Sequence, residues 1–83
     1  MPVHSSNTPR LKTTCIDGER CTLYIEPWGT EFDIQRGDAL FVESEAFVTG
    51  DVEVSAVPGG ISIAFTADVP ILITTLDGRT LSV

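Results

Sequence analysis

Positive charge is what this sequence has least of. The 83 residues hold five Lys and Arg against 12 Asp and Glu, which gives a net charge of −7. No Lys or Arg occurs between Gly37 and Gly78, where seven acidic residues lie: Asp38, Glu43, Glu45, Asp51, Glu53, Asp68 and Asp77. Nucleic acids and anionic membranes attract cationic groups, so we expect neither as a partner. A basic protein or a cation remains open as a partner, although such acidity also keeps a β-rich protein dissolved.

Long apolar segments and a secretory signal are also missing. No apolar run approaches the roughly 18 residues of a membrane-spanning helix, and residues 1–7 lack the basic and apolar regions of a signal peptide. A cytoplasmic location is therefore the expectation. Residues 1–9 are expected to form a flexible tail, followed by a single β domain over residues 10–83. Such a small domain should have modest stability unless chains associate.

Histidine and cysteine, which serve many catalytic and metal sites, are scarce. The one histidine, His4, lies in the expected tail, and the two cysteines are Cys15 and Cys21. A Ser-His or Cys-His pair needs an oriented imidazole beside the nucleophile, which a tail residue does not supply. Zinc sites need more ligands than these residues provide. We therefore assign no catalytic residue, metal ligand or cofactor, and we do not expect an enzyme.

The two cysteines flank residues 17–19, Asp-Gly-Glu, and Asp-Gly is a strong hairpin signal. A three-residue loop places Cys15 opposite Cys21, whereas a two-residue loop places Cys15 opposite Arg20 and Cys21 opposite Thr14. Directly opposed Cβ atoms lie about 4.5–5.5 Å apart, generally longer than a relaxed disulfide prefers. The sequence therefore predicts reduced cysteines that face the core as small hydrophobic side chains.

Residues 26–38 contain a strand, a corner and a second strand. Pro27 removes a backbone donor and Gly29 supplies a positive φ, so the chain turns there. Phe32 and Ile34 then alternate with polar residues, which is the period of a strand with one solvated face. The corner therefore joins two neighbouring strands.

The remaining segments also have the character of strands. Strands are expected at residues 11–16, 21–26, 39–43, 48–57, 61–66, 71–73 and 80–83. In the segment 48–57, Val52 and Val54 should face inward, whereas the run 71–73 is apolar on both faces and predicts a covered central strand. No segment indicates a helix. The fold class predicted is all-β, an antiparallel sandwich or small barrel of seven to eight short strands.

Five residues form a candidate interaction surface: Trp28, Glu43, Glu45, Asp51 and Glu53. The acidic residues fall into two pairs at i and i+2, which places each pair on one face of a strand, close enough to share a cation or a proton. Solvated strand faces produce the same pattern. Trp28 has two interpretations, a surface on which a ligand stacks or a side chain that fills the corner of the core, and we favour the second.

The segments 26–29 (EPWG) and 37–42 (GDALFV) carry a resemblance. With the short strand between them, they resemble a group of short, uncharacterised bacterial β proteins that have an EPWG-like corner. The chain is also similar, more distantly, to one half of a cupin barrel, in which a Gly-Asp turn precedes a strand. Arg36 stands where Pro is usual in that turn. Cupins bind metal through His and Glu, and no His follows residue 4, so this resemblance implies a pocket without metal.

From these features we rank three functions. A non-enzymatic interaction or structural module that self-associates comes first, because a small core is marginal and open strand edges invite pairing. The second is a small acidic inhibitor or immunity-type protein that covers a basic site on its target. The third is a metal-free, cupin-like pocket for a small ligand, which an apolar cavity with a few converging polar groups would favour.

Overall fold

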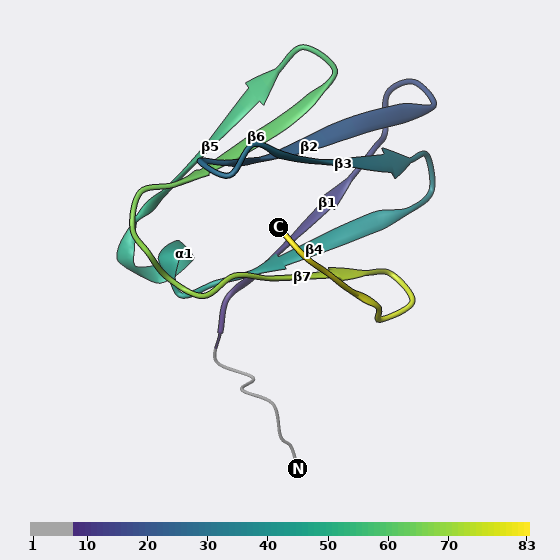
Figure 1. Cartoon of the computed structure of the whole chain (residues 1–83). Coiled ribbons are helices and arrows are strands. Elements are labelled where there is room, and N and C mark those ends of the chain that lie inside the picture. Colours follow the sequence, from purple (N-terminus) through teal and green to yellow (C-terminus); the bar gives the residue numbers. More distant parts are fainter. Residues whose placement is uncertain (1–7) are drawn as a thin grey trace.

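The computed structural model describes residues 8–83, which form two facing sheets of four strands each and one short helix (Figure 1). The predicted all-β fold of seven to eight strands is confirmed, and the two sheets do not close into a barrel. The expected tail falls largely outside the described residues. The elements are β1 (Arg10–Thr14), β2 (Arg20–Glu26), β3 (Thr30–Gln35), β4 (Ala39–Glu43), α1 (Ala46–Thr49), β5 (Val52–Val57), β6 (Gly60–Phe65), β7 (Leu72–Thr75) and β8 (Thr80–Leu81).

Sheet A has the strand order β1-β4-β7-β8, and sheet B has the order β3-β2-β6-β5. Neighbouring strands are antiparallel except for β2 and β6, which are parallel. The expectation of a purely antiparallel fold is therefore wrong for one pair. Parallel neighbours need a long connection, and here the chain passes through β3, β4, α1 and β5 before it returns beside β2.

The β2–β3 hairpin confirms the predicted strand, corner and strand. Ile25 pairs with Thr30, and the backbone N–H of Gly29 donates a hydrogen bond of 3.0 Å to the carbonyl of Ile25. Gly29 has a φ of 74°, a conformation that favours glycine, and the peptide bond before Pro27 is cis. The corner residues thus close the hairpin, while Leu23 of β2 pairs with Phe32 of β3.

The hairpin predicted around residues 17–19 is not formed. β1 pairs with β4 in sheet A, whereas β2 pairs with β3 and β6 in sheet B, so the Asp-Gly turn carries the chain from one sheet to the other. The hydroxyl of Thr13 also donates a hydrogen bond of 2.8 Å to the carbonyl of Leu40 in β4. A local turn signal specifies a reversal of the chain but not which strands pair across it.

The strand predicted over residues 48–57 begins only at Val52, because a single helical turn precedes it. The hydroxyl of Ser44 accepts a hydrogen bond of 3.1 Å from the N–H of Ala46, and the turn ends at Gly50 with a φ of 84°. Ala46 is buried against the core. This helix is far too short to cross a bilayer, and no other helix occurs in residues 8–83.

The core lies between the two sheets, and it shows that the run 71–73 is covered on one face only. Strand β7 lies between β4 and β8, with Ile73 1% exposed and Leu72 41% exposed. The prediction of a strand covered on both faces is therefore wrong. The buried hydrophobic cluster consists of Cys15, Leu23, Ile25, Ile34, Leu40, Val42, Ala46, Ile63, Phe65 and Ile73.

Candidate functional site

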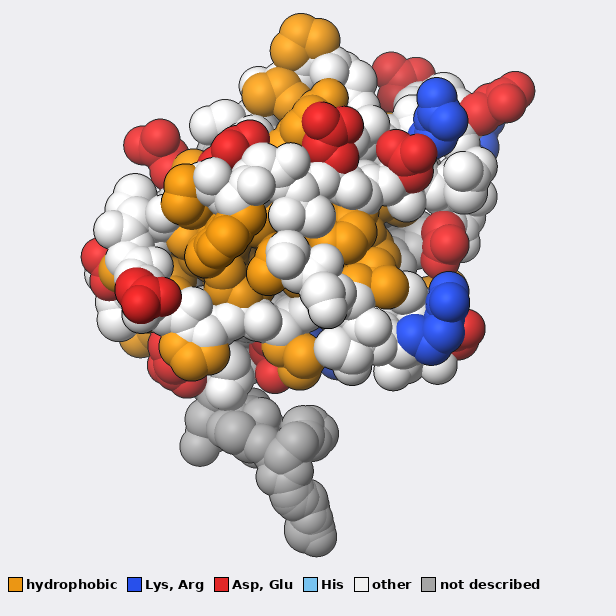
Figure 2. All heavy atoms as spheres, in the orientation of Figure 1, with side chains coloured by type: hydrophobic (Ala, Val, Ile, Leu, Met, Phe, Trp, Pro, Cys, Tyr) orange, Lys and Arg blue, Asp and Glu red, His pale blue; other side chains and the backbone are white. Residues whose placement is uncertain are grey.

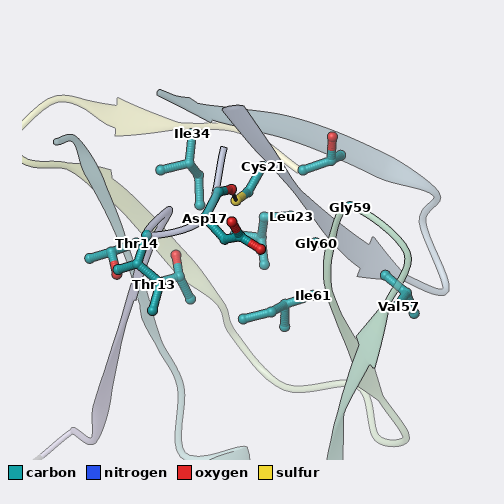
Figure 3. Close-up of a pocket in the computed structure, with 12 residues that line it drawn as sticks. Thr13, Thr14, Asp17, Cys21, Leu23, Ile34, Val57, Gly59, Gly60 and Ile61 are labelled. Carbon is teal, nitrogen blue, oxygen red and sulfur yellow. Dashed lines mark hydrogen bonds between the residues drawn. The ribbon is translucent and has the colours of Figure 1, made fainter. Parts of the chain in front are cut away.

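A cavity of about 320 Å³ opens between β1, the β1–β2 connection and the start of β6 (Figure 3). Its apolar walls come from Leu23 and Ile34, which are buried, and from the half-buried Ile61. In Figure 3 the carboxylate of Asp17 is directed into the same space, above Leu23. The cavity thus combines apolar walls with one acidic group at its mouth, a combination typical of sites for small ligands.

A disulfide between Cys15 and Cys21 lies beside the cavity. The predicted reduced thiols are therefore wrong. That prediction assumed directly paired hairpin strands, but Cys15 follows a strand of sheet A and Cys21 lies in a strand of sheet B. Their Cα atoms are 5.4 Å apart, within the range that disulfides span. The bond ties the two sheets together where the chain passes between them.

Two glycines form the wall of the cavity opposite β1. The carbonyl of Gly59 accepts a hydrogen bond of 2.9 Å from the N–H of Thr22, which aligns the start of β6 with β2. A Cβ added to Gly60 would lie 1.8 Å from the carbonyl oxygen of Thr22, closer than any real Cβ contact. The parallel pairing of β2 and β6 therefore depends on a missing side chain at residue 60.

Beyond the cavity, the β5–β6 hairpin has an inner face that sheet A does not cover. Val54 pairs directly with Ile63, so the two side chains share that face, yet Val54 is 50% exposed and Ile63 is fully buried. Ala56, which pairs with Ile61, is exposed as well. Val54 was expected to face inward, and its register agrees, but the rest of residues 8–83 leaves half of it exposed. We call the surface formed by Val54, Ala56 and Ile61 the open side.

Trp28 is at the opposite end of β6 from the cavity. It is 47% exposed, and its ring lies 6.1 Å from that of Phe65 in a shallow depression also lined by Pro27 and Asp68. The prediction that Trp28 fills the core is wrong. Phe65 occupies the buried position and packs edge-on against Phe47 at 6.2 Å, while the indole of Trp28 packs on Phe65 from the solvent side.

The acidic members of the candidate surface are not gathered at the cavity. Glu43 ends β4 and Glu45 lies beyond it, so one strand face does not hold both. Asp51 accepts a hydrogen bond of 2.7 Å from the hydroxyl of Thr49, and Glu53 is exposed on β5. In residues 8–83 no group of three or more His, Cys, Asp and Glu side chains is placed to hold a metal ion. Asp51 also lies outside β5, so the expectation that each pair shares one face of a strand is wrong for both pairs.

Charge is unevenly distributed over the molecule. On the face drawn in Figure 2, hydrophobic side chains are visible in the gap between the sheets, acidic groups surround them, and Lys and Arg lie on one side. Away from the cavity, a hydrogen bond from Thr75 lowers the pKa of the exposed Asp77, and the adjacent Arg79 lowers it further. That carboxylate supports the β7–β8 turn.

The cavity residues were missed at the level of sequence. Asp17 was identified only as part of a turn, and Ile61 only as one residue of an alternating strand. The cavity brings together residues from 13 to 61, so no short motif encodes it. Comparisons with protein-family models, curated proteins and solved structures find no match for this chain. The resemblance of the EPWG corner therefore stays a prediction.

Proposed function

We propose that this protein is a non-enzymatic interaction module that associates with further copies of itself through the open side. The observation that supports it is the half-exposed Val54 on the inner face of sheet B, directly beside the fully buried Ile63. Apolar area left in water costs about 25 cal/mol per Å² relative to its burial. A second copy that covers the inner face of β5 would recover that free energy.

Sedimentation equilibrium over a range of protein concentrations tests this proposal. We expect a mass above the 8.9 kDa of one chain, and we expect it to fall on dilution. The variant Val54→Lys should sediment as a single chain at concentrations at which the wild type associates. Val48→Lys is the matched control, because Val48 is also exposed but lies in α1. A single-chain mass for the wild type at the highest concentration reached would overturn the proposal.

A second function is favoured by the cavity itself. Its volume, its apolar walls and the Asp17 carboxylate fit a small apolar molecule that carries a cationic group, which is a metal-free ligand site of the kind the sequence ranked third. Phenethylammonium and the neutral 2-phenylethanol are suitable probes. We expect the ammonium compound to shift the methyl resonances of Leu23 and Ile61, and Asp17→Asn to weaken its binding but not that of the alcohol. No shift with either probe would refute a ligand site.

The disulfide also favours an oxidising compartment over the expected cytoplasmic location. Disulfides persist where thiols are not kept reduced, which is uncommon in the cytoplasm of mesophiles. Free thiols can be trapped by alkylation during lysis of the cells that make the protein. We expect Cys15 and Cys21 to escape labelling; modification of both would instead support a cytoplasmic location.

A further inference from the structure

We infer that two copies pair about a two-fold axis, with strand β1 of each copy added in parallel fashion to strand β5 of its partner. Sheet A of one copy would then continue into sheet B of the other, twice. This inference rests on the proposed self-association and names the surfaces that carry it.

The first observation is that β1 and β5 are both edge strands of similar length. β1 is the first strand of sheet A and β5 is the last strand of sheet B, so each has a paired neighbour on one side only. They contain five and six residues respectively. An edge strand has backbone N–H and C=O groups that point away from its sheet, and another strand of similar length can satisfy them.

The second observation is that the outer faces of the two strands carry opposite charges. Arg10 and Lys12 are exposed on β1, and they lie 4.3 Å and 5.9 Å from the centre of the Phe41 ring on the neighbouring strand. Glu53 is exposed on the outer face of β5. A two-fold dimer would bring Glu53 beside these cations twice, which favours this partner over one with an acidic edge.

The third observation is that the inner faces of the two strands are complementary. Leu11 and Thr13 of β1 face the core, and Thr13 is buried and lines the cavity. Val54 and Ala56 on the inner face of β5 are exposed. Adding β1 of a partner beside β5 places apolar Leu11 next to these two side chains. The partner would also cover the mouth of the cavity, which lies between the same two edges.

The fourth observation is the direction of the strands. In Figure 1, β1 and β5 both run from the lower left toward the upper right. A two-fold axis that runs parallel to these strands, beyond the open side and midway between the sheets, keeps strand direction and exchanges the levels of sheets A and B. It therefore sets β1 of one copy parallel to β5 of the other and in the same layer, where the two edge strands can share a parallel ladder.

The two remaining edges are less suitable. Strand β8 has two residues, too few for a ladder of useful length. Strand β3 carries exposed Glu31 and Asp33, so its pairing with the acidic β5 edge would bring like charges together. Among the four edge strands in residues 8–83, β1 is the one with two exposed cations. Charge and length thus select the combination of β1 with β5.

A charge-exchange experiment tests this interface. Lys12→Glu and Glu53→Lys should each raise the dimer dissociation constant about tenfold, because each change introduces two like-charge contacts per dimer. The double variant Lys12→Glu/Glu53→Lys should regain the wild-type constant within about threefold, since opposite charges again face each other. Glu31→Lys on β3 and Arg36→Glu in the following turn are controls, and both should dimerise like the wild type.

Hydrogen exchange on the wild-type protein provides a second measurement that needs no variant. Raising the concentration should slow exchange of the outward amides of β1 and β5, while those of β3 stay unchanged. If the protein dimerises but the double variant is no better than the single ones and protection appears on β3, the interface is wrong while self-association stands. If the wild type is a single chain throughout, both proposals fall.

Discussion

In sheet A the inward side chains of the central strands are covered, with Val42 0% and Ile73 1% exposed, whereas in sheet B coverage ends at β6. Ile63 on β6 is fully buried, but its direct neighbour Val54 on β5 is 50% exposed. The two sheets have the same number of strands, so strand number does not explain the difference. What differs is how much of each outer strand meets the opposite sheet.

An offset between the two sheets explains this asymmetry. On this side sheet A ends at β1, whose Thr13 lines the cavity together with Ile61 of β6, while sheet B continues beyond β6 to β5. Side chains on β5 therefore extend past the apolar surface that sheet A offers. An uncovered inner face is unusual for a small domain that must bury as much apolar area as it can. The comparison shows where the fold is complete within one chain and where a second chain can complete it.

The largest effect is expected at the junction of β2 and β6 inside sheet B. Gly60→Ala would place a Cβ 1.8 Å from the backbone oxygen of Thr22, which only a displacement of β6 from β2 can relieve. We expect a loss of more than about 4 kcal/mol in the free energy of unfolding, or failure to fold. Far-ultraviolet circular dichroism with urea titration measures it.

Gly59→Ala is the matched control for that substitution. Gly59 has a φ of 79° but no atom within 4 Å of an added Cβ, so the cost is conformational and should be about 1–2 kcal/mol. Equal losses at the two positions would contradict the steric explanation, and sheet B would then not depend on close approach at residue 60.

The second prediction compares the covered and uncovered parts of sheet B directly. Ile63→Ala should lower the free energy of unfolding by about 2–5 kcal/mol, because it leaves a cavity in the core. Val54→Ala should cost less than about 1 kcal/mol in the single chain, since half of that side chain is already in water. Urea denaturation at low protein concentration isolates the single chain from dimerisation. A loss at Val54 as large as that at Ile63 would mean that β5 is covered after all.

The third prediction concerns the bond that holds the two sheets together. Reduction of the disulfide should lower the free energy of unfolding by about 2 kcal/mol, the entropy expected for a short closed loop; the cysteines are six positions apart. Urea titrations with and without a phosphine reductant measure the change. The variant Cys15→Ala/Cys21→Ala should no longer respond to reductant. A reductant effect of zero on the wild type would indicate that the thiols are free, as the sequence alone suggested.

Sequence reasoning succeeded where neighbouring residues determine the structure. The strand at residues 39–43 was predicted with the bounds of β4, and Pro58-Gly59-Gly60 correctly marked the β5–β6 hairpin. It failed where contacts between segments far apart in the sequence determine the structure. The Asp-Gly turn at residues 17–18 was recognised, but the assignment of its flanking strands to different sheets depends on β4 and β6.

The remaining errors in the sequence-based predictions also arise because neighbouring residues alone do not determine the structure. Helix α1 has four residues, too few to show a helical period in the sequence. The exposure of Val54 depends on where sheet A ends, at β1, far earlier in the chain. The candidate cavity was missed because its walls come from five strands and two turns. Alternation predicts which face a side chain is on, but not whether anything covers that face.

The smallest effect is expected at Trp28, where sheet B turns between β2 and β3. Trp28→Ala should cost about 1–2 kcal/mol, well below the loss of about 3–5 kcal/mol typical of a large aromatic residue truncated in a core. The reason is that the indole is 47% exposed and packs against Phe65 from one side only. Phe65→Ala is the control and should show the larger loss, because Phe65 is buried. Thermal melts followed by circular dichroism avoid dependence on the missing indole. If Trp28→Ala proves as costly as Phe65→Ala, the corner belongs to the covered core, and the uncovered part of sheet B is confined to β5.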